Sequence, residues 1–102
     1  MDRFTVGATV PCSVRCQVFN DTTEVWVDTD FDAAFPTVTI YSPAGVALVS
    51  GAVLTDVGVG KARYLYTTTA LAKGFYKRVY KGQYTSGGEV HKPILVDGFW
   101  LE

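Results

Sequence analysis

Hydrophobic and polar residues alternate one by one along residues 9–19, TVPCSVRCQVF. One parity carries only small apolar side chains, namely Val10, Cys12, Val14, Cys16 and Val18. The positions between them are mostly polar, which is typical of a strand with one face on a core and the other in solvent. The pattern therefore predicts a half-buried antiparallel strand.

Five later segments show the same period of two. They predict strands over residues 37–42, 45–51, 61–68, 74–85 and 89–102. Turn residues lie between some of them: SPAG at 42–45 suits a four-residue turn, and the Gly pair at 87–88 suits the tip of a tight hairpin. No window of helical length has a helical period, although residues 69–74 have room for one helical turn that ends at Gly74.

One charged residue breaks the alternation of residues 74–85. Arg78 shares the parity of Tyr76 and Tyr80, which would direct a guanidinium toward the core. Two interpretations stay open. Either a bulge shifts the register at Lys77-Arg78, or this end of the strand leaves the core.

The final segment carries two irregularities. Ile94 and Val96 lie on one parity and Phe99 and Leu101 on the other, so a bulge is predicted at residues 97–98. Pro93 has no N–H for a ladder hydrogen bond, so this strand is expected to lie at a sheet edge or to be interrupted there.

Composition and charge narrow the class of protein. Of 102 residues, 48 % are hydrophobic and 14 % aromatic, which is too apolar for a disordered chain and suits a single domain over residues 1–102. Nine Lys and Arg against ten Asp and Glu do not favour nucleic acid as a partner. No apolar run reaches the roughly 18 residues of a membrane span. The N-terminal MDRFTVGATV lacks the layout of a signal peptide, so with Met1 as the native start we expect a chain that is made and kept in a cytoplasm.

The two cysteines are expected to be free core residues. Four residues along a strand separate the Cα atoms of Cys12 and Cys16 by about 13 Å, whereas a disulfide needs about 4–7 Å. A zinc site would need two more ligands, and His91 is the one histidine of the chain. We therefore expect buried, unmetallated thiols, no cofactor, and a reducing compartment during folding.

Three short motifs follow one another at a distinctive spacing between residues 36 and 85. They are Tyr41, Pro43 and Gly45 in Y-x-P-x-G, Gly58 and Gly60 in G-x-G before the aromatic strand with Tyr64 and Tyr66, and Gly74 and Tyr76 in G-x-Y. This arrangement resembles the bacterial and phage immunoglobulin-like domain. Together with turn signals about every ten residues, it predicts an all-β, immunoglobulin-like, two-sheet antiparallel sandwich of about seven strands.

The resemblance also implies structural roles and shows two departures. Tyr76 beside Gly74 looks like a tyrosine corner, in which the hydroxyl bonds to nearby backbone, so we interpret both residues as structural. Unlike antibody domains, the chain has no cysteine after residue 16, so no inter-sheet disulfide is expected. Residues 20–35 are also longer than the short link that the resemblance implies.

Alternate aspartates in VDTDFDAAF are the best candidate for a metal site. Asp28, Asp30 and Asp32 present oxygen ligands at i, i+2 and i+4, a spacing that suits calcium. An EF-hand loop starting at Asp28 would need Gly and Glu where the chain has Ala33 and Thr39. A looser calcium site is thus the alternative to a solvated acidic connection.

The remaining motifs do not indicate catalysis. Asn20–Thr22 matches the glycosylation sequon, which is short and frequent by chance. No nucleophile motif accompanies His91, and VGVGK at 57–61 lacks the spacing of a phosphate-binding loop and precedes a strand. We expect no enzymatic activity.

Charge is strongly polarised along the chain. All six charged residues between Cys16 and Gly60 are acidic, whereas seven of the eight from Lys61 to Lys92 are basic. Either the two segments face each other and cancel, or the domain carries an acidic and a basic patch that suits contacts between copies or docking on a charged scaffold.

The second arrangement gives five candidate interaction residues. They are Lys73, Lys77, Arg78 and Lys81 in the basic segment, together with Trp100. Strand alternation predicts that Lys77 and Lys81 face solvent. Trp100 has the parity opposite to that of Phe99 and Leu101, so it is expected either to point away from the core as a binding residue or to cover the open end of its own sandwich.

These features favour a non-enzymatic structural or interaction protein. Small stand-alone sandwiches are similar to short immunoglobulin-like proteins among phage structural genes, so the resemblance implies a virion component that decorates the capsid or sits at the head–tail region. Its expected partners are capsid or other virion proteins or copies of itself, in the virion after synthesis in the host cytoplasm. The alternative is an adhesive or carbohydrate-binding module of a larger protein at the cell surface. Nucleic acid and membrane are not expected partners.

Overall fold

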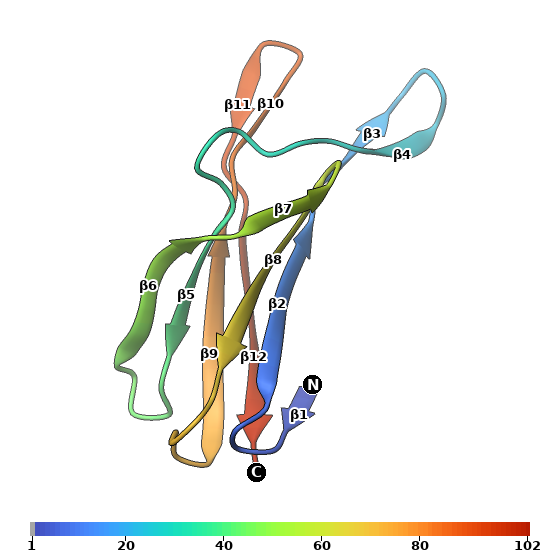
Figure 1. Ribbon diagram of the computed structural model, residues 1–102. Helices are drawn as coiled ribbons and strands as arrows, with labels where there is room; N and C mark the ends of the chain where they lie inside the picture. Colours follow the sequence, from blue (N-terminus) through green and yellow to red (C-terminus); the bar gives the residue numbers. More distant parts are fainter. Residues whose placement is uncertain (1) are drawn as a thin grey trace.

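The computed structural model describes residues 2–102 and is built from β-strands in that range (Figure 1). The largest sheet has the order β1-β12-β9-β5-β6. Its strands are β1 (Asp2–Phe4), β5 (Thr37–Tyr41), β6 (Ala47–Val53), β9 (Gly74–Lys81) and β12 (Ile94–Leu101). β1 pairs with β12 in parallel, and the other neighbours are antiparallel.

A smaller sheet and two hairpins complete the chain. The three-stranded sheet has the order β2-β8-β7, formed by β2 (Thr9–Arg15), β7 (Thr55–Gly58) and β8 (Lys61–Thr67). One hairpin joins β3 (Gln17–Asn20) to β4 (Val25–Asp28), and the other joins β10 (Tyr84–Ser86) to β11 (Glu89–His91). Among residues 2–102 no helix is long and apolar enough to cross a membrane.

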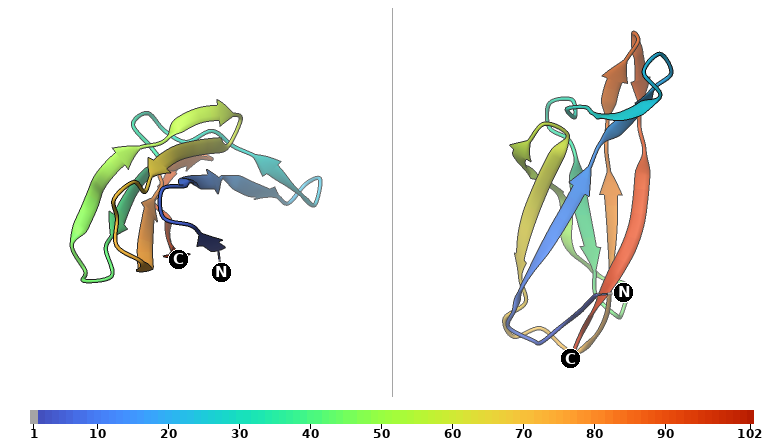
Figure 2. Two further views of the ribbon diagram at one scale, coloured as in Figure 1. Left: turned by 60° about the horizontal axis from the view of Figure 1, so that its bottom comes forward. Right: turned by 90° about the vertical axis from the view of Figure 1, so that its right-hand side faces the viewer.

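The core lies between the five-stranded and three-stranded sheets, as Figures 1 and 2 show. Val10, Cys12 and Ala62 enter it from the smaller sheet. The larger sheet contributes Val38, Ile40, Tyr76, Tyr80, Phe99 and Leu101. This all-β arrangement of several sheets is compatible with a β-sandwich.

Period-two alternation is confirmed in the central strands. In β8, Lys61, Arg63 and Leu65 are exposed, whereas Ala62, Tyr64 and Tyr66 are buried or half-buried. The SPAG turn closes with a hydrogen bond from Gly45 N to Ser42 O of 2.8 Å, and Gly87 and Gly88 form the tip of the second hairpin with φ of 62° and 79°. The interruption at Pro93 is confirmed, since β11 ends at His91 and β12 begins at Ile94.

The sequence expectations differ from the structure in three places. Residues 2–102 contain twelve strands where about seven were expected, partly because single residues split longer runs, such as Cys16 between β2 and β3 and Leu54 between β6 and β7. No helical turn forms over residues 69–74, where a turn with Ala70 at φ 61° is closed by Leu71 N and Thr68 O. The predicted bulge at residues 97–98 is wrong, because β9 and β12 keep one register from Ile94 to Leu101.

The molecule is elongated, with extents of 49 × 21 × 19 Å. Both hairpins project from one end of the sandwich, and the two termini lie toward the other (Figures 1 and 2). The chain thus has a sandwich body and a projecting end that is built from two separate two-stranded sheets.

Candidate protein-binding surface

The side of the five-stranded sheet that faces away from the core, here called the outer face, collects apolar and basic side chains. Pairing of β12 with β9 places Trp100 opposite Phe75, Gly98 opposite Lys77, Val96 opposite Val79 and Ile94 opposite Lys81. Directly opposed residues in an antiparallel pair lie on the same side of the sheet. All eight positions therefore belong to the outer face, while Tyr76, Arg78 and Tyr80 point to the core.

Aromatic rings occupy the end of the outer face near the termini. The centroids of Phe75 and Trp100 are 5.1 Å apart, and the guanidinium of Arg3 lies 5.9 Å from the Trp100 ring. A Cβ at Gly98 would come within 2.2 Å of Phe75 Cζ. Phe75 therefore lies across the glycine, and the close approach requires that no side chain is present there. Trp100 is 38 % exposed, which agrees with its predicted direction away from the core.

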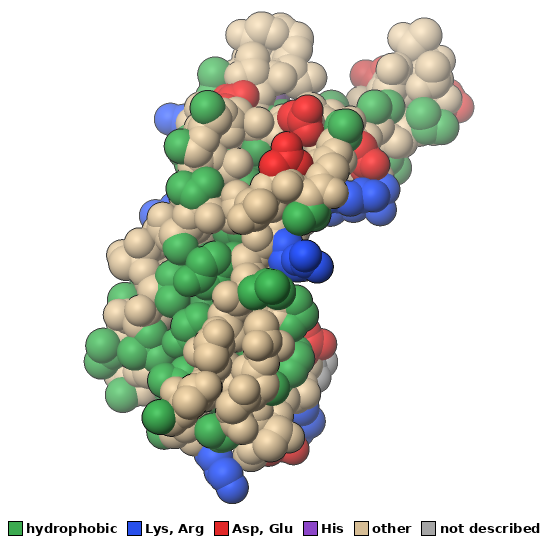
Figure 3. All heavy atoms as spheres, viewed as in Figure 1, with side chains coloured by type: hydrophobic (Ala, Val, Ile, Leu, Met, Phe, Trp, Pro, Cys, Tyr) green, Lys and Arg blue, Asp and Glu red, His purple; other side chains and the backbone are tan. Residues whose placement is uncertain are grey.

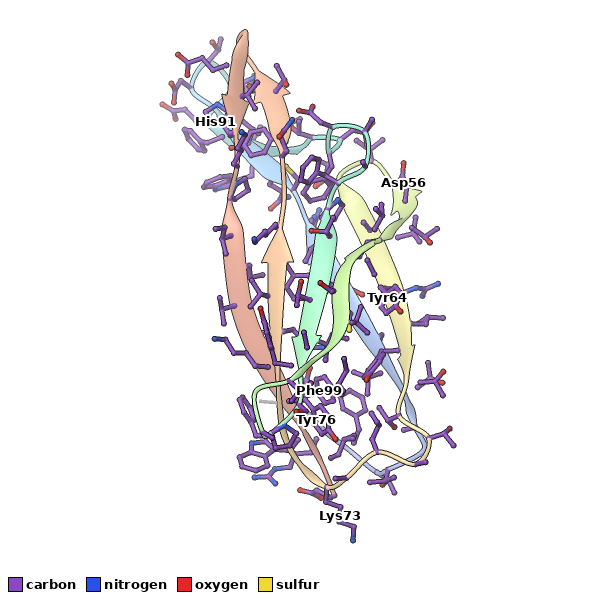
Figure 4. All side chains as sticks on the ribbon, turned by 90° about the vertical axis from the view of Figure 1, so that its left-hand side faces the viewer. Asp56, Tyr64, Lys73, Tyr76, His91 and Phe99 are labelled. Carbon is purple, nitrogen blue, oxygen red and sulfur yellow. The ribbon has the colours of Figure 1, made fainter. Side chains whose placement is uncertain are left out.

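Lysines line the same face. Lys77, Lys81 and Lys73 are exposed, which confirms the expectation for the first two, and Figure 4 places Lys73 at the tip of the β8–β9 connection. Lys77 Nζ lies 5.9 Å from the centroid of the Tyr41 ring. In the part of the chain that the structure describes, none of these three lysines has an ion pair. Their charges therefore remain available to a partner.

Arg78 does not belong to this basic surface, which corrects its prediction as an interaction residue. Its side chain is 4 % exposed and forms a two-pronged ion pair with Asp97, with Nε–Oδ1 of 2.8 Å and Nη2–Oδ2 of 3.0 Å. Burial is the largest single influence and opposes the charge, but the hydrogen bonds to Asp97 and Cys12 and the charge interactions with Tyr80 and Asp97 together outweigh it, so the pKa of Arg78 is raised. Both earlier interpretations of Arg78 are wrong: the register does not shift, and the strand stays on the core.

Arg78 also ties the two sheets together. Its Nη1 lies 3.4 Å from the carbonyl of Pro11 and 3.8 Å from Cys12 Sγ, both on β2. Its guanidinium carbon is 5.2 Å from the centroid of Phe99. A buried charge is tolerated here because these groups and Asp97 satisfy it from two sheets.

Tyr76 and Gly74, which were predicted to be structural residues, both make close contacts within the fold. Tyr76 Oη donates a 2.6 Å hydrogen bond to Ala72 O, which confirms that the hydroxyl bonds to nearby backbone. Gly74 has φ of +145°, and a Cβ there would lie 2.8 Å from Pro43 Cγ. Figure 4 shows Tyr76 beside Phe99 in the part of the core near the termini, and their rings stack with centroids 5.3 Å apart.

Cys12 and Cys16 are both buried and unpaired, as predicted. Desolvation by burial is the main cause that raises the pKa of each thiol. For Cys12, the neighbouring Arg78 partly opposes that rise. Neutral, buried thiols are poor nucleophiles, so these residues act in packing.

The three alternate aspartates do not converge on one site. Asp28 accepts hydrogen bonds from Arg15 Nε (2.9 Å) and Gln17 Nε2 (3.1 Å). Asp30 accepts from Gly60 N, and Asp32 from Gln83 Nε2 and Thr85 Oγ1. The Arg15 hydrogen bond lowers the pKa of Asp28. Among residues 2–102 no group of three or more His, Cys, Asp or Glu is placed to hold a metal ion.

These aspartates instead anchor the projecting hairpins. Cys16 N donates to Gly60 O (2.7 Å) and Thr29 N donates to Cys16 O (3.0 Å), which joins the base of the β3–β4 hairpin to the β7–β8 turn. A Cβ at Gly60 would lie 2.6 Å from Cys16 O, so this crossing requires glycine. Asp32 holds the β10–β11 hairpin through Gln83 and Thr85.

Sequence reasoning missed the β3–β4 hairpin as a candidate binding surface. Phe19, Val25, Trp26 and Val27 are all exposed on it, with Trp26 at 64 %. An open hollow lined by Val18, Val27 and Ser86, among others, separates it from the other hairpin, and Figure 3 shows the notch between the two projections. The available signal was the polar stretch NDTTE between the apolar runs VF and VWV, which is typical of a hairpin.

The edge of β12 was also missed. In the part of the chain that the structure describes, β1 pairs with Phe99, Trp100 and Leu101 only, so Ile94–Gly98 has a strand neighbour there on the β9 side alone. Ile94, Leu95 and Val96 are each more than half exposed. An exposed apolar edge strand is a template for pairing with another chain.

Charge on the molecule is only partly separated. Arg15 pairs with Asp28, and Lys61 lines the same small cavity as Asp30 and Asp56 (labelled in Figure 4), so some acidic and basic residues lie together near the projecting end. In Figure 3 acidic side chains gather on that end of the visible face. The lysines of the outer face lie on the opposite side of the sandwich and are not part of this compensation.

Comparison with protein-family models, with curated proteins and with solved structures found no match to this chain.

Proposed function

We propose that the chain is an immunoglobulin-like, non-enzymatic interaction protein, and that it serves as a component of a phage virion that decorates the capsid or sits at the head–tail region. The fold part of the proposal draws on strand order. With β2, β5, β6, β7, β8, β9 and β12 taken as strands B, C, C′, D, E, F and G, the two sheets read B-E-D and G-F-C-C′. Immunoglobulin domains divide their strands between sheets in the same way.

Two contacts add support for this fold. Tyr76 lies near the start of strand β9 and bonds back to Ala72, as a tyrosine corner does. In antibody domains the second cysteine of the inter-sheet disulfide follows that tyrosine by two residues. Here Arg78 holds that position, and it reaches Cys12 on β2, the strand that would carry the first cysteine.

The observation that carries the function is the outer face. Phe75, Val96 and Trp100 form an apolar strip beside Lys77 and Lys81, which have no ion pair among the described residues. Aromatic anchors with a polar rim are typical of protein-binding surfaces, and charges at that rim steer and orient a partner. The virion assignment itself rests on the resemblance to phage immunoglobulin-like domains.

His91 has a packing role, because its ring stacks on that of Tyr84 with the centroids 4.8 Å apart.

The test is co-sedimentation of the purified protein with capsids of the phage that encodes it. Lys77→Glu/Lys81→Glu and Trp100→Ala should each reduce occupancy, the first more strongly at low salt because exposed charges are screened at high salt. Arg63→Glu, an exposed residue of the smaller sheet, is the matched control and should leave occupancy unchanged.

Equal occupancy of all variants, with their fold intact by circular dichroism, would remove the outer face from the proposal. Failure of the unmodified protein to bind capsids, together with binding to a glycan array, would favour the adhesive or carbohydrate-binding alternative instead.

A further inference from the structure

The free edge of β12 has apolar side chains on both sides of the sheet. Ile94 and Val96 lie on the outer face, whereas Leu95 has the parity of the core. Leu95 also lines a hollow of about 100 Å³ together with Val14, Pro36, Tyr80 and Pro93. A strand added to this edge would therefore need apolar side chains on both of its own faces.

The β3–β4 hairpin meets that requirement. Phe19 pairs with Trp26 on one side, with ring centroids 5.4 Å apart, and Val18 pairs with Val27 on the other. Among residues 2–102, β4 has no strand neighbour except β3, so its other edge is unpaired. A lone two-stranded hairpin is marginally stable in water, and exposing both of its apolar faces adds a further cost.

The two elements are also complementary in charge. Asp21 and Glu24 are exposed at the turn of the hairpin, and neither has an ion pair within residues 2–102. Lys77 and Lys81 lie on β9 opposite Gly98 and Ile94, and Lys92 lies just before β12; all three are likewise exposed and without an ion pair in the described chain. Opposite charges on two apolar edges favour contact between those edges and steer their approach.

We propose that the β3–β4 hairpin of one copy adds to the free edge of β12 in a second copy of this chain, with β4 beside Ile94–Gly98. The contact extends the five-stranded sheet by two strands and covers Trp26 and Val96 at once. It is heterologous, because each copy offers one hairpin and one edge. Pairing of two β12 edges about a two-fold axis is less favourable, since it would bring the lysines of both outer faces together.

This inference rests on the proposed function only in taking the chain to be an interaction protein. The two surfaces share Val96, Lys77 and Lys81, but the two experiments have separate readouts, namely self-association of the purified protein here and occupancy of capsids there. Self-association can therefore fail while capsid binding succeeds, and the reverse is equally distinguishable.

The experiment is sedimentation velocity over a concentration series with three single-lysine variants. Trp26→Lys blocks the hairpin, and Val96→Lys blocks the edge in the way that natural edge strands are protected. Val53→Lys is the matched control, because Val53 is 53 % exposed against 54 % for Val96 but lies on β6, three strands away. The unmodified protein and Val53→Lys should gain mass with concentration, whereas each blocked variant should stay at the 11.1 kDa of a monomer.

Mixing the two blocked variants gives the decisive result. One retains a working edge and the other a working hairpin, so an equimolar mixture should form a dimer of twice 11.1 kDa and nothing larger. Val25→Lys, on the other side of the hairpin, replaces Trp26→Lys if circular dichroism shows that variant to be unfolded. A monomeric unmodified protein, association that survives either block, or a mixture that stays monomeric would each overturn the proposal.

Discussion

The two ends of the molecule treat apolar side chains differently. Near the termini, Tyr76 and Phe99 stack inside the sandwich and are at most 1 % exposed, and β1 covers the last residues of β12. At the projecting end, Trp26 is 64 % exposed on a hairpin whose two strands pair with no other strand among residues 2–102. Burial of the first kind stabilises the fold, whereas exposure of the second kind costs free energy unless another molecule covers it. The difference supports the proposal that the projecting end, like the outer face of the body, contacts another molecule.

The largest expected effect contrasts one aromatic residue from each end. Phe99→Ala should lower the free energy of unfolding by about 3–5 kcal/mol, because it opens a cavity between Tyr76 and Phe4. Trp26→Ala should cost less than about 1 kcal/mol, since it removes mainly the cross-strand contact with Phe19. Urea unfolding of dilute protein measures both. Equal losses would show that the hairpin is part of the folding core.

The second effect concerns the buried ion pair of the body. Asp97→Ala should lower the free energy of unfolding by roughly 3 kcal/mol, because the buried guanidinium of Arg78 loses the carboxylate that accepts two of its hydrogen bonds. This value is at the low end for a broken buried ion pair, since Asp97 itself is partly exposed. Lys77→Ala, the neighbouring outward residue on β9, is the matched control and should be nearly neutral by the same urea titration. A neutral Asp97→Ala would mean that the exposed Asp2, 3.8 Å from Arg78 Nη2, replaces the lost partner.

The variant Arg78→Cys tests whether Arg78 occupies the position of an inter-sheet cysteine. If Arg78 occupies the position of the missing inter-sheet cysteine, the introduced thiol should form a disulfide with Cys12 under mild oxidation. Mass spectrometry of alkylated protein reads this directly. Two free thiols at these positions in the oxidised, folded variant would contradict the immunoglobulin-like register.

These two residues also show where sequence reasoning ends. The alternation of polar and apolar residues predicted the strands around Val38, Ala62 and Tyr76, because each of these strands has one solvent-exposed face and one buried face. Arg78 and the change of parity after Val96 looked like two separate irregularities. The register places Arg78 directly opposite Asp97, so two inward charges neutralise each other, and a pairing between residues 19 apart is not visible in either segment alone.

The candidate site was predictable to a similar degree. Lys77, Lys81 and Trp100 follow from parity within single strands, and the structure places all three on the outer face. The alternation of residues 9–19 reached most of β3, but β4 and the hairpin did not follow, because Val25, Trp26 and Val27 place apolar side chains on both faces and no polar face marks them as a strand. The free edge of β12 depends on where β1 stops, which is a property of the sheet and not of a local pattern.

A smaller effect is expected at the corner tyrosine. Tyr76→Phe should cost about 1 kcal/mol, because it removes the hydrogen bond to Ala72 O and keeps the stacked ring. Thermal unfolding checks the loss. Tyr64→Phe is the control, because Tyr64 is a half-buried ring of the other sheet whose hydroxyl makes no hydrogen bond among residues 2–102, so its loss should leave stability unchanged.

The smallest effect is a dependence on alkaline pH. Burial raises the pKa of the Cys12 and Cys16 thiols, so the folded state keeps protons that the unfolded state loses. Their contribution is complete below the ordinary thiol pKa of about 8.5 and is lost as pH rises through the higher folded values. The free energy of unfolding should therefore decline from about pH 8.5 upward. The double variant Cys12→Ala/Cys16→Ala should show a smaller decline in the pH range below that in which tyrosine hydroxyls ionise. A decline of equal size in that variant would exclude the thiols as its cause.

Amide hydrogen exchange along β12 tests the central claim most directly, because one strand contains both environments. In dilute protein, the amides of Ile94–Gly98 that face away from β9 should exchange fast, whereas Phe99–Leu101, paired on both sides, should be protected. As concentration rises, protection should appear at Ile94–Gly98 and at Val25–Asp28 together, with no change at Phe99–Leu101. Exchange at the edge that stays independent of concentration would contradict the account.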